Sequence, residues 1–496
     1  MNLKITDHLI QEQLKQITRR HFLQNLSTGI GGIAAASILG GCSTFFDKKG
    51  NPTQISNNPM EPSVSHFRAK AKKIIYMHMA GAPSQIELFD YKPELYKLNG
   101  KECPPSLLEG KKFAFINGKP NMLGPIASFN QYGNSGAWVS NHLPNFSRAV
   151  DEVCFIKSMH TNEFNHAPAQ LFMHTGSPRM GRPAIGAWVT YGLGSENENL
   201  PGFIVLASGG KTPDAGKSIW GSGFLPSVYQ GVQCRSEGDP VLYVSDPHNQ
   251  DRTIKGDIIN TINEINKEHL AEYNDPEINT RIAQYEMAYK MQISVPEVMD
   301  ISKEPAYIHQ MYGTQPGKSS FANNCLLARR LVEQGVRYVQ LFHWGWDSHG
   351  ADDFTSLTGG FVERCKEIDQ AMTALLEDLK QRGLLEETLI VWGGEFGRTP
   401  IREIRPGANP KNIGRDHNPD AFTVWMAGAG VKAGYTHGET DEISFNVIKD
   451  KVHVHDFQAT ILHLLGMNHE QLTYFYQGRD FRLTDVHGQI VKQVLS

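Results

Sequence analysis

The stretch ANNCLLARRLVEQGVRYVQLFHWGWDSHG, residues 322–350, predicts the fold class. Its first part places apolar residues three and four apart and stops at Gly335, which is typical of an amphipathic helix with a glycine end. The run VRYVQLF (336–342) is almost continuously apolar, as expected of a strand covered on both faces. A polar loop follows where this strand ends. A helix, a buried strand and a polar loop in this order indicate an α/β protein.

Similar apolar runs recur along the chain, and helical patterns separate them. The runs are KKIIYMHM (72–79), GFIVL (202–206), TLIVWGG (388–394) and AFTVWMAG (421–428). Because alternating strands and helices build a sheet covered on both faces, we predict a three-layer α/β/α sandwich with a mostly parallel central sheet. Residues 208–320 break the alternation, and we predict that they form an insertion or cap over the sheet.

The N-terminus predicts export. TRRHFLQ contains the pair Arg19 and Arg20, a twin-arginine pattern, and the apolar run LSTGIGGIAAASILGGC follows it. This run is too short to cross a bilayer. Its end, LGGC, resembles the box at which bacterial lipoproteins are cleaved and acylated, here on Cys42. The alternative is an amphipathic first helix with an incidental arginine pair.

These features divide the chain into three parts. Residues 1–42 are predicted to be a signal peptide that ends at the lipidated cysteine, residues 43–71 a polar tether, and residues 72–490 the folded domain. We therefore expect the twin-arginine machinery to export the protein and a lipid to hold it on the periplasmic side of a membrane, in the cell envelope.

Composition narrows the class of partner. The formal charge of the 496 residues is −4, and no block of lysine or arginine follows the signal, so we expect no nucleic acid partner. The cysteines beyond Cys42 are scattered, odd in number and without a CxxC pair. This pattern does not indicate a disulfide framework or a zinc ribbon, although a single bridge stays open as an alternative.

Metal-ligand residue types gather around the ends of the predicted strands. Ligands of open parallel sheets bind outside the carboxyl ends of the strands, and GRDHNPD, just before the run 421–428, can fold back to the same edge. Crowded carboxylates repel each other unless cations neutralise them. We therefore predict a divalent metal site with Zn, Mn or Ca, which bind mixed carboxylate and imidazole ligands. The candidate ligands are Glu87, Asp347, His349, Glu395, Asp416 and His417.

A purely structural interpretation of the loop with Asp347 and His349 is that its polar side chains hydrogen-bond to the loop's own backbone. The metal hypothesis makes a sharper prediction. Residues two apart in an extended segment share a face, so both side chains can bind one ion.

Candidate catalytic residues follow the strand-like run EVCFI. Asn165 and His166 begin a helical pattern, and a helix N-terminus is a ready site for an oxyanion. We predict these two residues and Arg398 as catalytic, with Arg398 or Arg415 holding the anion. The alternative for His166 is a capping or exposed histidine. Two hydroxyls lie nearby without a recognisable nucleophile motif, Ser158 and Thr161.

The motifs GAPSQIELFD, GWDSHG, GGEFGRTP and GRDHNPD resemble, in order and spacing, those of a bacterial twin-arginine-exported family of unknown function, domain of unknown function 1501. This family lies within or close to the alkaline phosphatase and sulfatase superfamily, and the resemblance spans residues 72–490. It implies an alkaline-phosphatase-like fold. It also implies that Asp347 and His349 stand for a close Asp/His ligand pair, Glu395 for a late-strand acidic ligand and His417 for the final histidine.

Two departures from the superfamily bear on the chemistry. Glu87 stands where related sequences often have Asp, and EFGRT replaces the usual DHG. No nucleophile motif is evident near Asn165, so a metal-bound water is the alternative attacking group to the hydroxyls of Ser158 and Thr161.

The resemblance implies a metal-dependent hydrolase of phosphate or sulfate esters, with an anionic ester as substrate. The alternative is a non-catalytic envelope lipoprotein of the same fold that binds a polysaccharide or a partner protein.

Overall fold

The computed structural model describes residues 59–111, 113–116, 118–235, 261–266, 276–405 and 407–496. The predicted signal peptide and most of the tether, including Arg19, Arg20 and Cys42, lie outside these residues.

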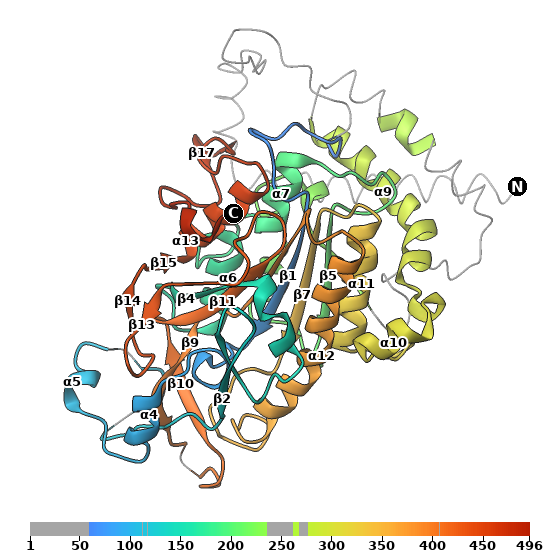
Figure 1. Ribbon diagram of the computed structural model, residues 1–496. Coiled ribbons are helices and arrows are strands. Elements are labelled where there is room, and N and C mark those ends of the chain that lie inside the picture. The colour runs from blue at the N-terminus through green and yellow to red at the C-terminus, as the bar shows by residue number, and fades with distance from the viewer. Residues whose placement is uncertain (1–58, 112, 117, 236–260, 267–275, 406) are drawn as a thin grey trace, which may run out of the picture. The chain divides into compact units, whose positions relative to one another are not determined.

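A nine-stranded sheet forms the centre of the domain, in the order β12-β4-β11-β8-β1-β7-β5-β6, with β15 beside β4. Figure 1 shows β1, β7 and β5 side by side. All pairs are parallel except those made by β11, which runs antiparallel to both β8 and β4. The strands are β1 (Lys73–Ala80), β4 (Val153–His160), β5 (Phe203–Ser208), β6 (Val232–Cys234), β7 (Tyr338–Trp344), β8 (Thr388–Gly393), β11 (Phe422–Ala427), β12 (Tyr435–His437) and β15 (Val452–His453).

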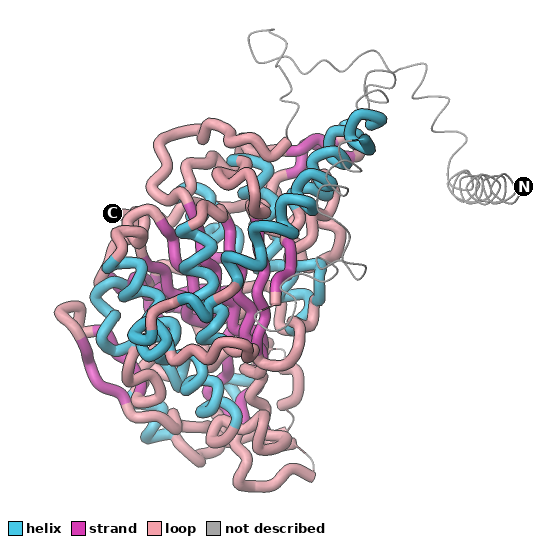
Figure 2. Tube along the Cα trace, turned by 90° about the vertical axis from the view of Figure 1, so that its right-hand side faces the viewer, coloured by secondary structure: helices cyan, strands magenta, loops and turns pink. Residues whose placement is uncertain are grey.

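Helices cover both faces of this sheet. Alternate residues of β1 enter two separate cores: Ile75 and Met77 face one, while Ile74 and Tyr76 face the other. The first core is closed by α11 (Phe321–Glu333) and α12 (Gly360–Gln381), and the second by α6 (His166–Thr175), α7 (Ile185–Leu193) and α13 (Val454–Leu464). Figure 2 shows helices crossing in front of the strands. The predicted α/β class with a mostly parallel sheet is confirmed.

The predicted helix and strand of the opening stretch form where their residues favour them. The Ser320 side chain accepts a hydrogen bond from the Asn323 N–H, which caps the start of α11. The chain leaves the helix through Gly335, whose φ of +86° is left-handed, and then enters the fully buried start of β7.

Shorter elements surround the sheet. Those that matter for the site are the antiparallel strands β9 (Gly397–Glu403) and β10 (Gly414–Asn418). The others are α3 (Gln85–Leu88), α4 (Pro93–Leu98), α5 (Pro105–Leu108), β2 (Phe129–Tyr132), β3 (Ala137–Ser140), β13 (Glu439–Thr440), β14 (Val447–Lys449), β16 (Tyr474–Tyr476) and β17 (Arg479–Phe481).

The region 208–320 is described in part. Its strand β6 extends the sheet beside β5, and its helices α9 (Pro276–Met299) and α10 (Ala306–Tyr312) pack against α11 and α12. Residues 236–260 and 267–275 lie outside the described residues, so a cap over the sheet stays a prediction.

Two further findings concern the described residues only. Their five cysteines are buried and free, so the bridge left open by the sequence does not form among them. No described helix has the length and apolar character that crossing a membrane requires.

Candidate metal centre

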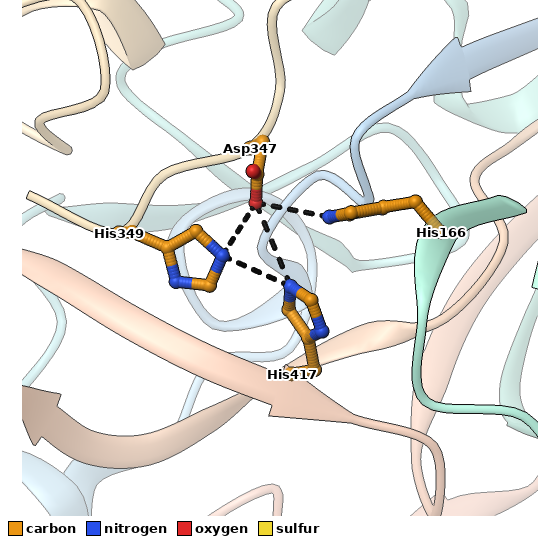
Figure 3. A group of neighbouring side chains, drawn as sticks. All are labelled: His166, Asp347, His349 and His417. Carbon is orange, nitrogen blue, oxygen red and sulfur yellow. Dashed lines mark hydrogen bonds and ion pairs between the residues drawn. The ribbon is translucent and has the colours of Figure 1, made fainter. Parts of the chain in front are cut away.

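Four side chains point their donor atoms at one another (Figure 3). Asp347 Oδ1 lies 2.8 Å from His349 Nε2, 3.0 Å from His166 Nε2 and 3.6 Å from His417 Nε2. The Nε2 atoms of His349 and His417 are 3.0 Å apart. One ligand atom from each of the four residues lies within 4.8 Å of the other three. We call these four residues the donor group.

The topology explains why these residues meet. Asp347 and His349 follow the carboxyl end of β7, and His166 starts α6 after the carboxyl end of β4. His417 lies near the end of β10, which leads into the first residue of β11. Because β11 is antiparallel to β8 and β4, its start lies at the edge where those strands end. All four residues therefore reach the same edge of the sheet.

The other ring nitrogen of each histidine is held by a hydrogen-bond acceptor. Metal-binding histidines usually donate their second N–H to a carboxylate or a backbone carbonyl, which fixes the tautomer that offers the remaining nitrogen to the ion. The acceptors for Nδ1 are Glu403 Oε2 for His349 (2.5 Å), Glu395 Oε1 for His166 (2.7 Å) and the Phe164 carbonyl oxygen for His417 (2.6 Å).

With these tautomers, the donor group lacks a positive charge between its acceptor atoms. With Nδ1 donating, a neutral His349 presents a lone pair at Nε2, and this atom faces His417 Nε2 and Asp347 Oδ1. Three acceptors at such distances repel each other unless positive charge lies among them. Protons or a metal ion can supply that charge.

Burial and neighbouring charges set the pKa values in opposite directions. Burial lowers the pKa of His166, but hydrogen bonds to Asp347 and Glu395 outweigh it and raise the pKa to about 9. Burial lowers the pKa of His417 to about 4, assisted by the nearby Arg398 charge. Burial alone would raise the pKa of Asp347, but Arg398 and the three histidines hold it well below its usual value. Without a metal, His166 therefore holds a proton against the Asp347 carboxylate.

The donor group fits a transition ion. Zn²⁺ bonds of about 2.0 Å in a tetrahedron separate the ligands by roughly 3.3 Å. The three distances from Asp347 Oδ1 and the distance between His349 and His417 range from 2.8 to 3.6 Å. Three imidazoles and one carboxylate suit Zn²⁺ or Mn²⁺, whereas Ca²⁺ takes six to eight oxygen ligands. Of the metals predicted, Ca²⁺ is the one that this donor set does not favour.

The structure separates the predicted ligands into two sets. Asp347, His349 and His417 lie in the donor group, and His166, predicted as catalytic, lies there as well. Glu395 lies behind His166 and does not reach the other donors, because its Oε1 binds His166 Nδ1 and the Gly81 N–H.

Glu87 and Asp416 also lie outside the donor group. Glu87 is fully buried and forms an ion pair with Arg415, with its Oε1 2.7 Å from Arg415 Nη2. One Asp416 oxygen accepts hydrogen bonds from the backbone N–H groups of Phe115 and Ile116, at 2.8 and 3.0 Å. Asp416 does lie near His349 and Glu403, and these three residues form a second, smaller group of potential metal ligands.

The predicted anion-binding arginines are buried. Arg398 has no exposed surface, and its guanidinium donates to the carbonyl oxygens of Gly81, Ala82 and Arg415 and to Asp347 Oδ1. Arg415 is equally buried against Glu87. Both guanidinium groups are already bound inside the protein, so this geometry does not support the prediction that either arginine holds the substrate anion, which stays a prediction.

Asn165 and the nearby hydroxyls have different surroundings. Asn165 is exposed at the N-cap of α6, and its side chain makes no cap hydrogen bond. Ser158 is fully buried and donates to the Asp450 carbonyl oxygen at 2.6 Å. Thr161 is also buried. Asn165 is therefore open to a substrate, whereas Ser158 is not.

Sequence reasoning missed two supporting groups, the Glu403 carboxylate and the Phe164 carbonyl. Glu403 stands at the end of β9, four residues beyond the GEFGRT motif, and no local pattern marks it. Its antiparallel pairing with Gly414 brings it beside the donor group.

The model of a family described as "Protein of unknown function (DUF1501)" matches residues 71–495. The chain belongs to this family. None of the curated proteins matches the sequence. Among solved structures, this DUF1501 member resembles an alkaline phosphatase mutant of TAB5, an Antarctic bacterium, at 11% identity and a TM-score of 0.34, over 81% of this chain and 99% of that one.

Two other solved structures are similar to a comparable degree. The lipoteichoic acid synthase LtaP from Listeria monocytogenes matches at 10% identity and a TM-score of 0.33, over 86% of this chain and 78% of that one. The PsFucS1 sulfatase from Pseudoalteromonas sp. matches at 12% identity and a TM-score of 0.35, over 81% and 69%. Scores this low say nothing about a shared activity.

Proposed function

We propose that this DUF1501 protein is an exported, lipid-anchored, metal-dependent hydrolase of phosphate or sulfate esters. The observation that carries the proposal is the donor group, in which three imidazole nitrogens and one carboxylate oxygen face one another while each second ring nitrogen is held from behind. The twin-arginine pair and Cys42 support the export and the anchor.

The donor group would hold one divalent ion through His166, Asp347, His349 and His417. Such an ion would act as a Lewis acid toward an ester oxygen and make a water molecule easier to deprotonate. The protein itself keeps the donors in place: Glu395 and Glu403 hold the rings of His166 and His349. Arg398 holds Asp347 Oδ1 at 2.7 Å.

The start of α6 suits an anionic ester. Asn165 is exposed there, next to His166, and the ten-residue helix directs its positive end toward the same edge. With both buried arginines committed elsewhere, the helix N-terminus and the ion would share the recognition of the anion. The motif resemblance to phosphatases and sulfatases supports phosphorus or sulfur as the reacting centre.

One observation favours the non-catalytic alternative. Ser158, one of the two hydroxyls that precede Asn165, is fully buried and donates its hydrogen bond to the Asp450 carbonyl oxygen, so it offers no covalent nucleophile. A metal-binding protein that hydrolyses nothing would also show the donor group.

The test combines metal content with turnover. The purified protein is loaded with Zn²⁺ or Mn²⁺, its metal is counted, and its hydrolysis of 4-nitrophenyl phosphate, bis(4-nitrophenyl) phosphate and 4-nitrophenyl sulfate is measured. We expect one ion per chain and hydrolysis that stops when the ion is removed. An ion without hydrolysis of any of these esters would favour the binding protein, and no ion would refute the metal centre.

A further inference from the structure

A row of buried polar side chains continues inward from the donor group. Behind His166 comes Glu395, and behind Glu395 come His78 of β1 and His174 of α6, with Tyr76 beside them. We call His78 and His174 the inner histidine pair. Their ring centroids are 4.6 Å apart, and neither side chain has any exposed surface.

The inner histidine pair is costly for a purely structural core. Among the described residues, neither ring nitrogen of His174 nor the Tyr76 hydroxyl has a hydrogen-bond partner. His78 Nε2 and Glu395 Oε2 lie 3.3 Å apart, in a contact that does not have the geometry of a hydrogen bond, and neither atom has another polar partner there. A buried polar atom without a partner has lost its hydrogen bonds to water and gained none in exchange, which destabilises the folded state. Apolar side chains of similar size would fill this space without that cost. Packing alone therefore does not explain why positions 78 and 174 carry histidines.

The contact between His78 and Glu395 supplies such a reason. Oε1 of Glu395 is saturated by His166 Nδ1 (2.7 Å), the Gly81 N–H (3.0 Å) and Gln170 Nε2 (3.1 Å). Oε2 faces His78 Nε2 at 3.3 Å. His78 is thus the residue placed to hold the free oxygen of the carboxylate that orients His166.

Helix α6 couples the same groups from the other side. His166, Gln170 and His174 are four residues apart and so lie along one face of the helix. On this face, His166 and Gln170 both hydrogen-bond to Glu395. His174 packs against the ring of His78. The sheet contributes His78 between Phe342 of β7 and Gly393 of β8, so its backbone is fixed on both sides.

We propose that His78 is a positioning residue of the metal centre, acting through Glu395 on the metal ligand His166. A donor at the His78 Nε2 position holds Glu395 Oε2, which keeps Oε1 in line with His166 Nδ1. His174 packs against His78 and keeps its ring turned toward Glu395. The inference rests on the proposed metal centre and adds to it a residue that contacts neither the ion nor the substrate.

The test replaces His78 in the full chain and measures Zn²⁺ affinity by competition with a chromophoric chelator. His78→Gln keeps an N–H donor near the Nε2 position, His78→Asn keeps polarity but is too short, and His78→Leu removes both. Loss of the partner directly behind a metal-binding histidine weakens metal affinity about 10–100-fold, and His78 lies one contact further out, so the lower end of this range, about tenfold, applies to it. We expect that loss for the Asn and Leu variants and near wild-type affinity for the Gln variant.

Tyr76→Phe is the matched control, because it removes a buried polar atom from the same row that makes no hydrogen bond to Glu395. Its Zn²⁺ affinity should equal that of the wild type. The Co²⁺ absorption spectrum gives a second readout and should shift in His78→Asn but not in Tyr76→Phe. The Asn and Gln variants decide the question if His78→Leu does not fold.

The remaining outcomes separate the inference from the proposed function. If the wild type binds Zn²⁺ and all three His78 variants bind it equally well, the positioning role is wrong and the metal centre stands. If Tyr76→Phe weakens binding as much as His78→Asn, the effect is one of packing and the inference fails. If the wild type binds no metal, both fail together.

Discussion

Asp347→Asn is the substitution that tests the donor group most directly. Asp347 Oδ1 is the one anionic donor in a group otherwise made of three imidazoles, and it lies within 3.6 Å of all three Nε2 atoms. An amide keeps the shape of the side chain but removes its charge. It can also turn its NH₂ group toward the histidines, where a donor would compete with the ion.

The size of the effect follows from the position of Asp347. Removing an outer partner of a metal ligand costs about 10–100-fold in affinity, so removing a direct anionic ligand should cost at least about 100-fold, which corresponds to about 3 kcal/mol. A second cost falls on the fold. The fully buried Arg398 loses its only anionic partner among the described residues, although the 37% exposure of the Asp347 side chain screens that ion pair. We expect a loss of stability of about 1–3 kcal/mol.

Zn²⁺ competition with a chelator measures the first quantity, and denaturant unfolding of the metal-free protein measures the second. Asp420→Asn is the matched control, because Asp420 lies in the same GRDHNPD motif but pairs with Lys111 at 2.5 Å, at a half-exposed position. It should leave both quantities nearly unchanged. Asp347→Asn with wild-type Zn²⁺ affinity would refute the donor group and leave the loop as a backbone cap.

Three further predictions use other parts of the chain. His166, with a pKa of about 9, must lose its proton to bind an ion, so Zn²⁺ affinity should rise about tenfold per pH unit and level off above that pKa; an affinity that does not change below pH 9 would contradict this. Gly81→Ala should abolish Zn²⁺ binding, because φ at this residue is +109° and a Cβ would lie 2.5 Å from the Asp347 backbone nitrogen; unchanged affinity would show that the turn yields. Cys42→Ala should release the protein from the membrane fraction into the soluble periplasm, and a variant that stays with the membrane would rule out the anchor.

The sequence predicted well what depends on short-range pattern. Apolar runs and helical spacing gave the α/β class, because burial on both faces leaves a direct mark on composition. The spacing of Asp347 and His349 led to the prediction that both side chains face the same way, and their 2.8 Å separation agrees with it. No distant residue had to be known for either prediction.

The sequence could not predict the role of a residue whose partner lies far away along the chain. Glu87 and Glu395 are both carboxylates in motifs near strand ends, and nothing local distinguishes them. Glu87 meets the buried guanidinium of Arg415, which stands 328 positions away, whereas Glu395 meets His166. A carboxylate binds whichever cation the fold brings to it. The same reason explains why His166 was predicted beside the reacting centre and lies among the donors.

The direction of a single strand decides whether the donor group forms at all. His417 lies on the chain before β11, and in a fully parallel sheet that position would belong to the opposite edge, a whole strand length from Asp347. The antiparallel pairing of β11 with β8, in which Trp425 stands opposite Trp392, brings the start of β11 to the edge where β8 ends. The β9 and β10 pair then fills the turn between these two strands and carries both Arg398 and His417. Apolar runs report burial but not strand direction, so the GRDHNPD motif could be placed at this edge only as a loop that folds back. In the structure, the antiparallel direction of β11 brings the motif to this edge, and no loop has to fold back.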